Sequence, residues 1–206
     1  MALIQIFARP PIEGQVKTRL IADLGERLAT DIYRYCLDYT INLARQSGIE
    51  FQIWLSEESD DPVFQGQDCR LQKGADLGSR MLQAISSQLR QQTSANAKVI
   101  LIGSDCLDMT KHHLQQAIEA LGRNDMVLLP ALDGGYALIG CRRIEAQIFA
   151  NVAWGSGDVY GQTLRNAGEL GYQVLSLETV RDIDTLRDVN HYAELTRILH
   201  EGGNNL

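Results

Sequence analysis

Short apolar segments alternate with longer helical patterns along this chain, and this alternation limits the folds open to it. The segments that read as strands are Leu3–Phe7, Glu50–Leu55, Cys69–Gln72, Val99–Ile102, Met126–Pro130, Tyr136–Cys141 and Tyr172–Leu175. Val99–Ile102 is apolar throughout, which is typical of a strand in the middle of a parallel sheet. Alternating strands and helices predict an α/β fold with a largely parallel sheet.

The segments between these strands repeat apolar residues every three or four positions, as amphipathic helices do. The predicted helices are Asp23–Gln46, Asp76–Arg90, Thr110–Leu121, one opened by Ser156 or Asp158 and reaching Leu170, and Thr185–Leu199. Gly48 suits the end of the first helix, Asp76 suits the N-cap of the second, and the polar segment Gln91–Ala97 reads as a loop. With no repeat, linker or low-complexity segment, we expect one domain over residues 1–206.

The acidic composition excludes several classes of function. The net charge is −7 and no run of lysine or arginine offsets it, so the surface repels nucleic-acid phosphates. No stretch approaches the roughly 18 apolar residues of a transmembrane helix, and the N-terminal sequence lacks the pattern of a signal peptide. The four cysteines are far apart and form no C-x-x-C pair. We therefore expect a cytoplasmic protein with reduced thiols that binds neither nucleic acid nor membrane.

A basic loop follows the first predicted strand. The segment Phe7–Leu20 carries Arg9, Lys17 and Arg19 around Gly14. Rigid prolines and one permissive glycine shape such a loop, and its cations suit a diphosphate or a triphosphate. The P-loop spacing G-x-x-x-x-G-K-[ST] is absent. A phosphate-binding loop is the favoured interpretation, and a solvated basic loop is the alternative.

The segment Gly103-Ser-Asp-Cys-Leu-Asp108 follows the most apolar predicted strand. Ligands of open α/β sheets bind beyond the carboxyl ends of the strands, where the carboxylate of Asp105 should emerge. Two carboxylates three residues apart can share Mg²⁺ or Mn²⁺, which in turn bridges phosphate oxygens. Asp108 has a structural alternative, because it could instead cap the helix that follows Thr110.

Three further segments are candidate parts of a site. Gly134 and Gly135 after Asp133 permit a close backbone approach to a ligand, although Asp-Gly-Gly is also an ordinary hairpin turn. The helix that follows Trp154-Gly-Ser-Gly could meet an anion of an acceptor with its N-terminus. Asp182 and Asp184 project to the same side if their segment is extended, so they could supply a second metal ligand. The N-cap of the final helix is an equal alternative for Asp184.

Together and in this order, these motifs resemble an uncharacterised bacterial family (DUF2064) within the nucleotide-diphospho-sugar transferase superfamily, also described as glycosyltransferases associated with arsenosugar biosynthesis. The matching segments span nearly the whole chain: Phe7-Ala-Arg-Pro-Pro, Gly14-x-Val-Lys-Thr-Arg-Leu20, Asp76-Leu-Gly-Ser-Arg-Met81, Gly103-Ser-Asp-Cys106, Asp133-Gly-Gly-Tyr136, Trp154-Gly155 and Asp182-Ile-Asp-Thr185. Each segment is weak alone, but their order is specific. The chain departs from the family at Leu107, where relatives commonly carry proline.

The resemblance implies a GT-A-type fold, a Rossmann-like and mostly parallel sheet sandwiched by helices. It also implies roles for residues that follow the strands. The implied nucleotide contacts are Arg9, Gly14, Lys17, Arg19, Gly78 and Ser104. An aspartate after the central strand holds a divalent metal in this superfamily; by position it is Asp105, with Asp182 or Asp184 as a second ligand. Asp133 would orient a sugar hydroxyl or act as a base, and the implied acceptor or sugar region is Gly134, Gly135, Tyr136 and Trp154.

Three functions agree with this sequence. The preferred hypothesis is a glycosyltransferase that uses Mg²⁺ or Mn²⁺, a nucleotide-diphosphate sugar and a small-molecule acceptor. The first alternative is a nucleotidyltransferase that joins an NTP to a small phosphorylated acceptor and releases pyrophosphate. The second alternative is a non-catalytic nucleotide-binding protein. The donor base, the sugar, the acceptor and the oligomeric state are left open by the sequence.

Overall fold

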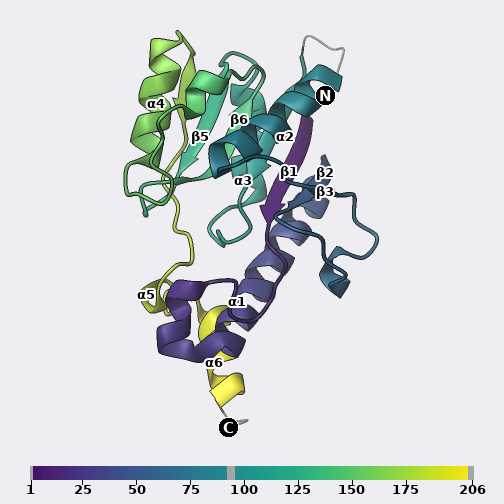
Figure 1. The fold of residues 1–206 in the computed structure, drawn as a ribbon, viewed down its shortest axis with the longest axis vertical. Helices are drawn as coiled ribbons and strands as arrows, with labels where there is room; N and C mark the ends of the chain where they lie inside the picture. The colour runs from purple at the N-terminus through teal and green to yellow at the C-terminus, as the bar shows by residue number, and fades with distance from the viewer. Residues whose placement is uncertain (1, 92–95, 204–206) are drawn as a thin grey trace.

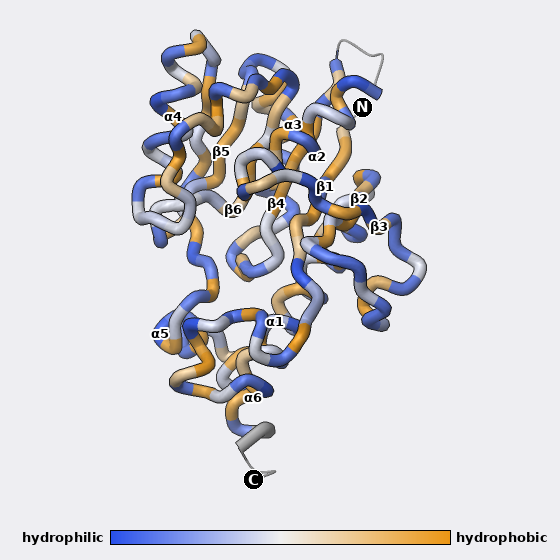
Figure 2. Tube along the Cα trace, in the orientation of Figure 1, coloured by the Kyte–Doolittle hydropathy of each residue, from blue (hydrophilic) through white to orange (hydrophobic). Residues whose placement is uncertain are grey.

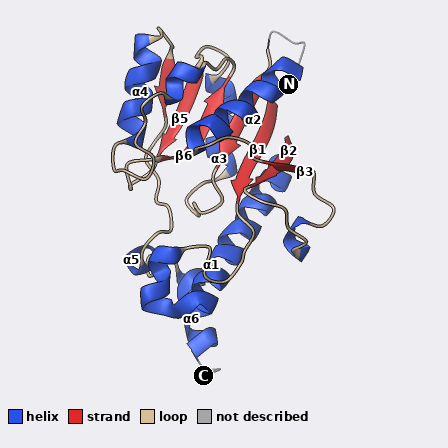
Figure 3. Cartoon of the chain, viewed as in Figure 1, coloured by secondary structure: helices blue, strands red, loops and turns tan. Residues whose placement is uncertain are grey.

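The computed structural model describes residues 2–91 and 96–203, and a seven-stranded sheet forms its centre (Figures 1 and 3). The strands are β1 (Ala2–Ala8), β2 (Glu50–Leu55), β3 (Cys69–Leu71), β4 (Lys98–Ile102), β5 (Met126–Pro130), β6 (Tyr136–Cys141) and β7 (Val174–Ser176). Their order is β3-β2-β1-β4-β6-β5-β7. Strand β6 runs antiparallel to β4 and β5, and the other neighbouring pairs are parallel. The predicted α/β fold with a largely parallel sheet is confirmed.

Helices cover both faces of this sheet. The helices are α1 (Thr18–Ser47), α2 (Leu77–Gln91), α3 (Lys111–Ala120), α4 (Val159–Glu169), α5 (Leu186–Val189) and α6 (Ala193–Gly203), with short 3-10 turns at Pro62–Phe64 and Ala146–Phe149. Helices α1 and α3 share one apolar cluster with the sheet, whereas α2 and α4 share another. The apolar strands lie between these layers, as the orange segments of Figure 2 show. The sandwich that the resemblance implied is therefore present.

The first helix differs from its prediction. It begins at Thr18 rather than Asp23, and Gly25 (φ 77°, ψ 165°) interrupts it with a non-helical residue. Apolar periodicity predicted a helix only from Asp23, so it missed the first turn before the kink at Gly25. Consequently Thr18 and Arg19 lie in a first helical turn instead of a loop.

The C-terminal part also differs from its prediction. The helix expected over Thr185–Leu199 is two helices, α5 and α6, separated at Asn190–Tyr192. Both lie beside the first part of α1, below the sheet in Figure 1. A third apolar cluster joins these elements, with Leu20, Ile32, Ile183, Val189 and Leu195 fully buried. Packing against α1 divides the C-terminal segment into two short helices. The apolar periodicity of the sequence continues through both, so it could not reveal the break.

Caps explain most of the remaining helix ends. Asp76 accepts a hydrogen bond from the backbone N–H of Ser79, as expected of an N-cap residue. Asp158, one of the two predicted starts, is the N-cap of α4. Thr110 is the N-cap of α3, so the alternative that Asp108 caps this helix is wrong. Most of the predicted loop Gln91–Ala97 lies outside the described residues.

No helix among the described residues is both long enough and apolar enough to span a membrane. The carboxyl ends of the parallel strands and the beginning of β6 meet at one edge of the sheet. The loops that leave this edge carry most of the residues singled out in the sequence.

A glycine in α2 permits the closest helix contact near this edge. Gly78 is buried, and a Cβ added there would lie 2.6 Å from Trp154 Cζ2 and 2.8 Å from Phe149 Cβ. We expect Gly78→Ala to lower the free energy of unfolding by about 1–3 kcal/mol, because the helix and the indole must move apart. Gly168→Ala in α4 is the control, since a Cβ there meets nothing within 4 Å. Its helix propensity should raise stability by about 0.5 kcal/mol. Urea unfolding of both variants checks this, and a Gly78→Ala protein as stable as Gly168→Ala would contradict it.

Candidate active site

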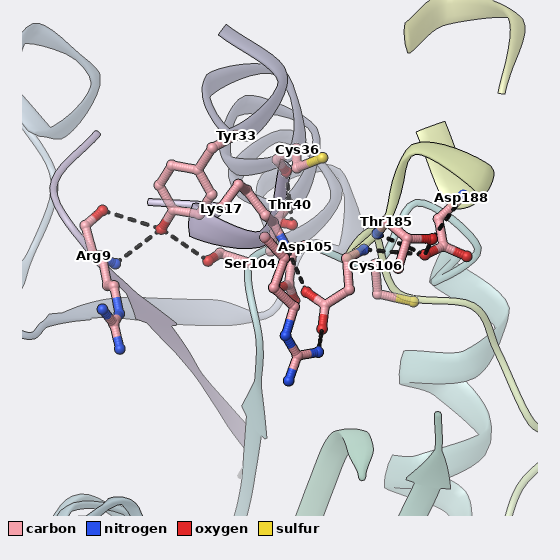
Figure 4. A network of polar contacts seen from close by, with 12 residues as sticks. Arg9, Lys17, Tyr33, Cys36, Thr40, Ser104, Asp105, Cys106, Thr185 and Asp188 are labelled. Atoms are coloured by element: carbon pink, nitrogen blue, oxygen red, sulfur yellow. Dashed lines mark hydrogen bonds and ion pairs between the residues drawn. The ribbon is translucent and has the colours of Figure 1, made fainter. Parts of the chain in front are cut away.

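Lys17 joins three segments that are distant in the sequence. It precedes α1, and its Nζ lies 2.7 Å from Asp105 Oδ2 and 3.3 Å from Asp184 Oδ1. Asp105 follows β4, and Asp184 precedes α5. The backbone of Lys17 is left-handed (φ 46°, ψ 44°), which is uncommon for a residue with a Cβ. The ion pairs therefore hold the start of α1 against the edge of the sheet (Figure 4).

The Lys17 side chain is only 5% exposed, and this burial opposes its charge. The pKa of Lys17 is nevertheless raised above its ordinary value, because Asp105 and Asp184 lie against the ammonium group. Arg19 adds a second cation, with Nη1 2.7 Å from Asp184 Oδ2. Both oxygens of Asp184 thus face cations of the N-terminal segment.

Tyr33 of α1 fixes the backbone of the basic loop. Its hydroxyl accepts a hydrogen bond from the N–H of Arg9 at 2.9 Å and donates to the carbonyl of the same residue at 3.1 Å. It also lies 3.1 Å from Ser104 Oγ, in the loop after β4 (Figure 4). Burial raises the pKa of Tyr33, so the hydroxyl keeps its proton. Tyr33 was not predicted from the sequence, because its partners Arg9 and Ser104 lie 24 and 71 positions away and no local pattern signals these contacts.

The turn after β4 is tied to the segment before α5. Asp108 Oδ2 accepts a hydrogen bond from the N–H of Arg181, and Asp108 Oδ1 accepts one from the hydroxyl of Tyr192. The carbonyl of Asp105 accepts one from the N–H of Ile183 at 3.0 Å. Leu107, at the position where relatives commonly carry proline, packs against the third apolar cluster. These contacts hold the turn in place without a proline.

Three carboxylates gather at the same edge. Oxygen atoms of Asp133, Asp182 and Asp184 lie within 4.8 Å of one another. Asp133 comes from the turn between β5 and β6, and its Oδ1 accepts a hydrogen bond from the N–H of Gly135 at 2.7 Å. The structure thus brings Asp182 and Asp184 together and adds Asp133, whereas Asp105 is engaged by Lys17.

Asp182 has the most unusual electrostatic environment of the four aspartates. Burial raises its pKa to about 7, with further contributions from Asp133, Asp184 and Asp105. Among the described residues, no ion pair reaches its carboxylate. Mutual repulsion of this kind is relieved when carboxylates share a cation. The donor set therefore fits a hard divalent metal such as Mg²⁺ or Mn²⁺.

Asp188 positions the segment that carries these aspartates. Thr185, rather than Asp184, is the N-cap of α5, so the alternative cap role of Asp184 is wrong. Asp188 Oδ2 accepts hydrogen bonds from the N–H groups of Thr185 and Asp184 (Figure 4). Its other oxygen accepts from Arg181 Nη1 at 2.8 Å. Because Asp188 makes these capping contacts, the side chain of Asp184 can contact Lys17 and lie beside Asp133 and Asp182.

Two cavities meet at this edge. The larger one, about 580 Å³, lies beyond the ends of β1, β2 and β3. We call it the basic cavity, because it is lined by the four cations Arg9, Lys17, Arg19 and Arg80. The smaller one, about 290 Å³, lies beyond β4, β5 and β6. We call it the acidic cavity, because it is lined by Asp105, Asp133, Asp182 and Asp184. Five residues line both cavities: Phe7, Leu77, Gly103, Asp105 and Asp184.

Most predicted site residues lie in one of these cavities. Arg9, Lys17, Arg19 and Ser104 line the basic cavity, and Gly135, Tyr136 and Trp154 line the acidic one. Gly14 (φ 79°) lies in the basic loop, and a Cβ added there would contact the carboxylate of Glu26 in α1. Gly78 lines neither cavity and packs against Trp154, while its neighbours Leu77 and Arg80 do line the basic cavity. Arg80 was missed by the sequence analysis, although it stands in the matched segment Asp76–Met81.

Gly134 allows a close backbone contact beside the acidic cavity. Its φ is 89°, and a Cβ there would collide with the carbonyl of Gly157. The carbonyl of Gly134 accepts a hydrogen bond from the N–H of Tyr160 at 2.9 Å. Gly134 therefore allows the start of α4 to lie against the turn that carries Asp133.

The fold belongs to the class of nucleotide-diphospho-sugar transferases, as the comparison with solved structures shows. The chain is 27% identical to a protein from Desulfovibrio desulfuricans G20 provisionally named a nucleotide-diphospho-sugar transferase, with a TM-score of 0.88 over 98% of this chain and 95% of that chain. It shares its fold alone with a nucleotidyl transferase from Methanothermobacter, with 16% identity, a TM-score of 0.59 and coverage of 96% and 98%. It also shares the fold of CMP:2-keto-3-deoxy-manno-octonic acid synthetase complexed with CTP, with 12% identity, a TM-score of 0.53 and coverage of 100% and 99%.

The chain belongs to a family described as uncharacterized protein conserved in bacteria (DUF2064), whose model matches residues 37–156. No curated protein matches the chain. The family to which the sequence motifs pointed is thus confirmed.

The raised pKa of Asp182 has a consequence for stability. The folded-state pKa of about 7 lies above the unfolded value of roughly 3.9, so ionisation of Asp182 opposes folding. This cost is absent below about pH 4, develops between about pH 4 and 7, and is complete above about pH 7. In metal-free buffer we expect Asp182→Asn to raise the free energy of unfolding at pH 8 by about 1–2 kcal/mol, a value reduced because the carboxyl is partly open to solvent.

Unfolding curves from pH 4 to pH 8 in EDTA measure this difference. Asp68→Asn is the matched control, because Asp68 is an exposed carboxylate at the other end of the sheet and forms an ion pair with Arg70. Its stability should stay within about 0.5 kcal/mol of the wild type at every pH. An Asp182→Asn protein that gains nothing at pH 8 relative to pH 4 would refute the assignment.

Proposed function

We propose that this protein is a metal-dependent transferase that takes a glycosyl group from a nucleotide-diphosphate sugar and passes it to a small-molecule acceptor. One observation carries the proposal. A cavity lined by cations and a cavity lined by carboxylates meet at Asp105 and Asp184. A nucleotide diphosphate in the first would place its terminal phosphate at the junction, beside the carboxylates that fit a metal.

The basic cavity would hold the nucleotide. Its volume of about 580 Å³ lies within the usual range for small-molecule sites. Arg9, Arg19 and Arg80 would bind phosphate oxygens through charge-assisted hydrogen bonds. The same guanidinium groups would stabilise the charge that develops on the leaving diphosphate. A protein of the same fold is complexed with CTP, which supports nucleotide binding by a protein of this fold.

The acidic residues would hold Mg²⁺ or Mn²⁺. Asp133, Asp182 and Asp184 are the ligands that the geometry favours, with Asp105 beside them. The metal would polarise the diphosphate and offset its charge. Lys17 keeps Asp105 and Asp184 aimed at this point through its two ion pairs. Asp105 would therefore act with Lys17 to position the site rather than as the principal ligand.

Asp133 would also face the acceptor. It lines the acidic cavity, and the Gly135 N–H holds one of its oxygens in place. Its other oxygen would accept a hydrogen bond from a hydroxyl of the sugar or the acceptor. The β5–β6 turn, which positions this oxygen, is itself fixed by the close contact of Gly134 with Gly157.

A second candidate function is nucleotidyl transfer, in which an NTP is joined to an acceptor and pyrophosphate is released. The basic cavity favours it to the same degree, and a nucleotidyl transferase shares the fold. The products separate the two reactions. Release of a nucleoside diphosphate from a sugar nucleotide supports glycosyl transfer, whereas release of pyrophosphate from an NTP supports nucleotidyl transfer.

A thermal-shift screen tests the proposal. We expect one nucleoside diphosphate and its sugar nucleotides to raise the melting temperature in the presence of Mn²⁺, and to have little effect in EDTA. At a ligand concentration about a hundredfold above Kd the gain should be about 2.7 kcal/mol, or roughly 5–10 °C for a chain of this size. Asp184→Asn should abolish the dependence on Mn²⁺, and Asp68→Asn should retain it. Nucleotide binding that ignores both Mn²⁺ and Asp184→Asn would indicate a non-catalytic nucleotide-binding protein instead.

Arg80 provides a test of the nucleotide position. It lines the basic cavity from α2, an element separate from the N-terminal loop. We expect Arg80→Ala to weaken nucleotide binding about tenfold, because one charge-assisted contact with phosphate is lost. Arg70→Ala is the control, since Arg70 lies in β3 and lines neither cavity. Calorimetric titration measures both affinities, and equal affinities for the two variants would place the nucleotide elsewhere.

A further inference from the structure

The acidic cavity has no cation in its lining. The residues that line it include four aspartates, and within the described part of the chain no lysine, arginine or histidine is among them. Lys17 lies on the far side of Asp105 and lines only the basic cavity. Arg165 of α4 is paired with Asp158 at 2.8 Å, and neither residue lines the cavity. The four cations that line the site therefore all lie in the basic cavity, which also contains Asp76, whereas Asp105 and Asp184 stand at the junction and Asp133 and Asp182 line the acidic cavity alone.

The rest of the acidic cavity is mostly apolar. The side chains of this wall include Leu77, Met81, Tyr136, Trp154 and Val159. Trp154 is held by Phe149, with ring centroids 6.0 Å apart, and by the close approach of Gly78 to its indole. Aromatic and aliphatic walls of this kind take up apolar faces of ligands, including the C–H face of a sugar ring. At about 290 Å³ the cavity is near the lower limit for small-molecule sites, so its occupant is small.

We propose that the acidic cavity binds an uncharged or cationic small molecule with an apolar face, and that it rejects phosphorylated and other anionic molecules. This inference rests on the proposed function in one respect, because it makes this molecule the acceptor of the transferase. The chemistry of the cavity itself does not depend on that assignment. It also separates the two candidate reactions, since a nucleotidyltransferase with a phosphorylated acceptor needs cations on this side.

Charge explains the rejection. A phosphate placed in this cavity would meet carboxylates at close range and no guanidinium or ammonium group to pair with. A divalent metal shared by Asp133, Asp182 and Asp184 would still leave that group with net negative charge, and Lys17 is engaged by Asp105 and Asp184. A hydroxyl or an ammonium group, by contrast, can donate hydrogen bonds to these carboxylates.

Trp154 fluorescence tests the proposal, because Trp154 lines the acidic cavity and not the basic one. The probes are phenyl β-D-glucoside and its 6-phosphate, which differ only in the phosphate group. In the presence of Mg²⁺ we expect the uncharged probe to change the emission with a Kd lower by about tenfold or more than that of the phosphate. Trp154→Phe, which keeps an aromatic wall, should remove the change in emission. Tighter binding of the phosphate, or no response to the uncharged probe up to its solubility limit, would overturn the proposal.

A substitution that adds a cation to the lining of the acidic cavity provides the converse test. Ser156 lines the cavity and is half-buried. We expect Ser156→Lys to strengthen binding of the 6-phosphate about tenfold and to leave the uncharged probe unchanged, whereas Ser156→Gln, of similar bulk, should alter neither. Equal effects of the two substitutions would show that charge does not govern selection.

The two proposals can fail separately. The uncharged probe needs neither nucleotide nor metal, so its binding in EDTA reports on the cavity alone. A protein that binds this probe but fails the nucleotide screen would refute the proposed transferase and keep the chemistry of the cavity. A protein that passes the nucleotide screen and prefers the phosphate probe would refute only this inference.

Discussion

The ion pairs of Lys17 with Asp105 and Asp184 are the interaction on which the rest of the site depends. They connect the start of α1, the end of β4 and the segment before α5, three segments that lie far apart in the sequence. The ammonium group is buried, so its desolvation is offset only while both carboxylates remain in place. Removal of one partner would leave a buried charge uncompensated, which costs more than the pair itself contributes. The left-handed backbone of Lys17 is tolerated for the same reason, because the side chain is anchored where the helix must begin.

This anchor also divides the charges of the site. Lys17 and Arg19 occupy the side of Asp184 that faces the basic cavity, while Asp133 and Asp182 lie on its other side. Asp184 is therefore held by cations on one side and repelled by carboxylates on the other. A cation added to the site therefore lowers the energy most beside Asp182, which has no ion pair among the described residues. A phosphate gains most on the opposite side, near Arg9 and Arg80. The same ion pairs thus give the two cavities their different chemistry.

Much of this arrangement could be predicted from the sequence, and the remainder shows what local patterns omit. Apolar runs located all seven strands, and the rule that ligands bind at the carboxyl ends of strands placed Asp105 at that edge. The antiparallel direction of β6 was not predicted, because strand direction depends on pairing between distant segments. The start of α1 was wrong because Gly25 breaks the apolar period, and the single C-terminal helix was wrong because α5 and α6 pack separately against α1. The contacts of Lys17 and Tyr33 join residues 24 to 167 positions apart, a separation that no local spacing reveals.

The crowding of carboxylates is best understood as a cost to stability that favours ligand binding. Asp182 is partly buried and lies near three other aspartates, and the rise in its pKa from burial and from these neighbours means that ionisation of Asp182 opposes folding at neutral pH. A core that served stability alone would place an amide or an apolar residue there. The segment is nevertheless held firmly, by the Asp188 cap on one side and by the hydrogen bonds of Asp108 on the other. A firmly held group of carboxylates that repel one another is expected where a bound cation, rather than a side chain of the fold, offsets their charge.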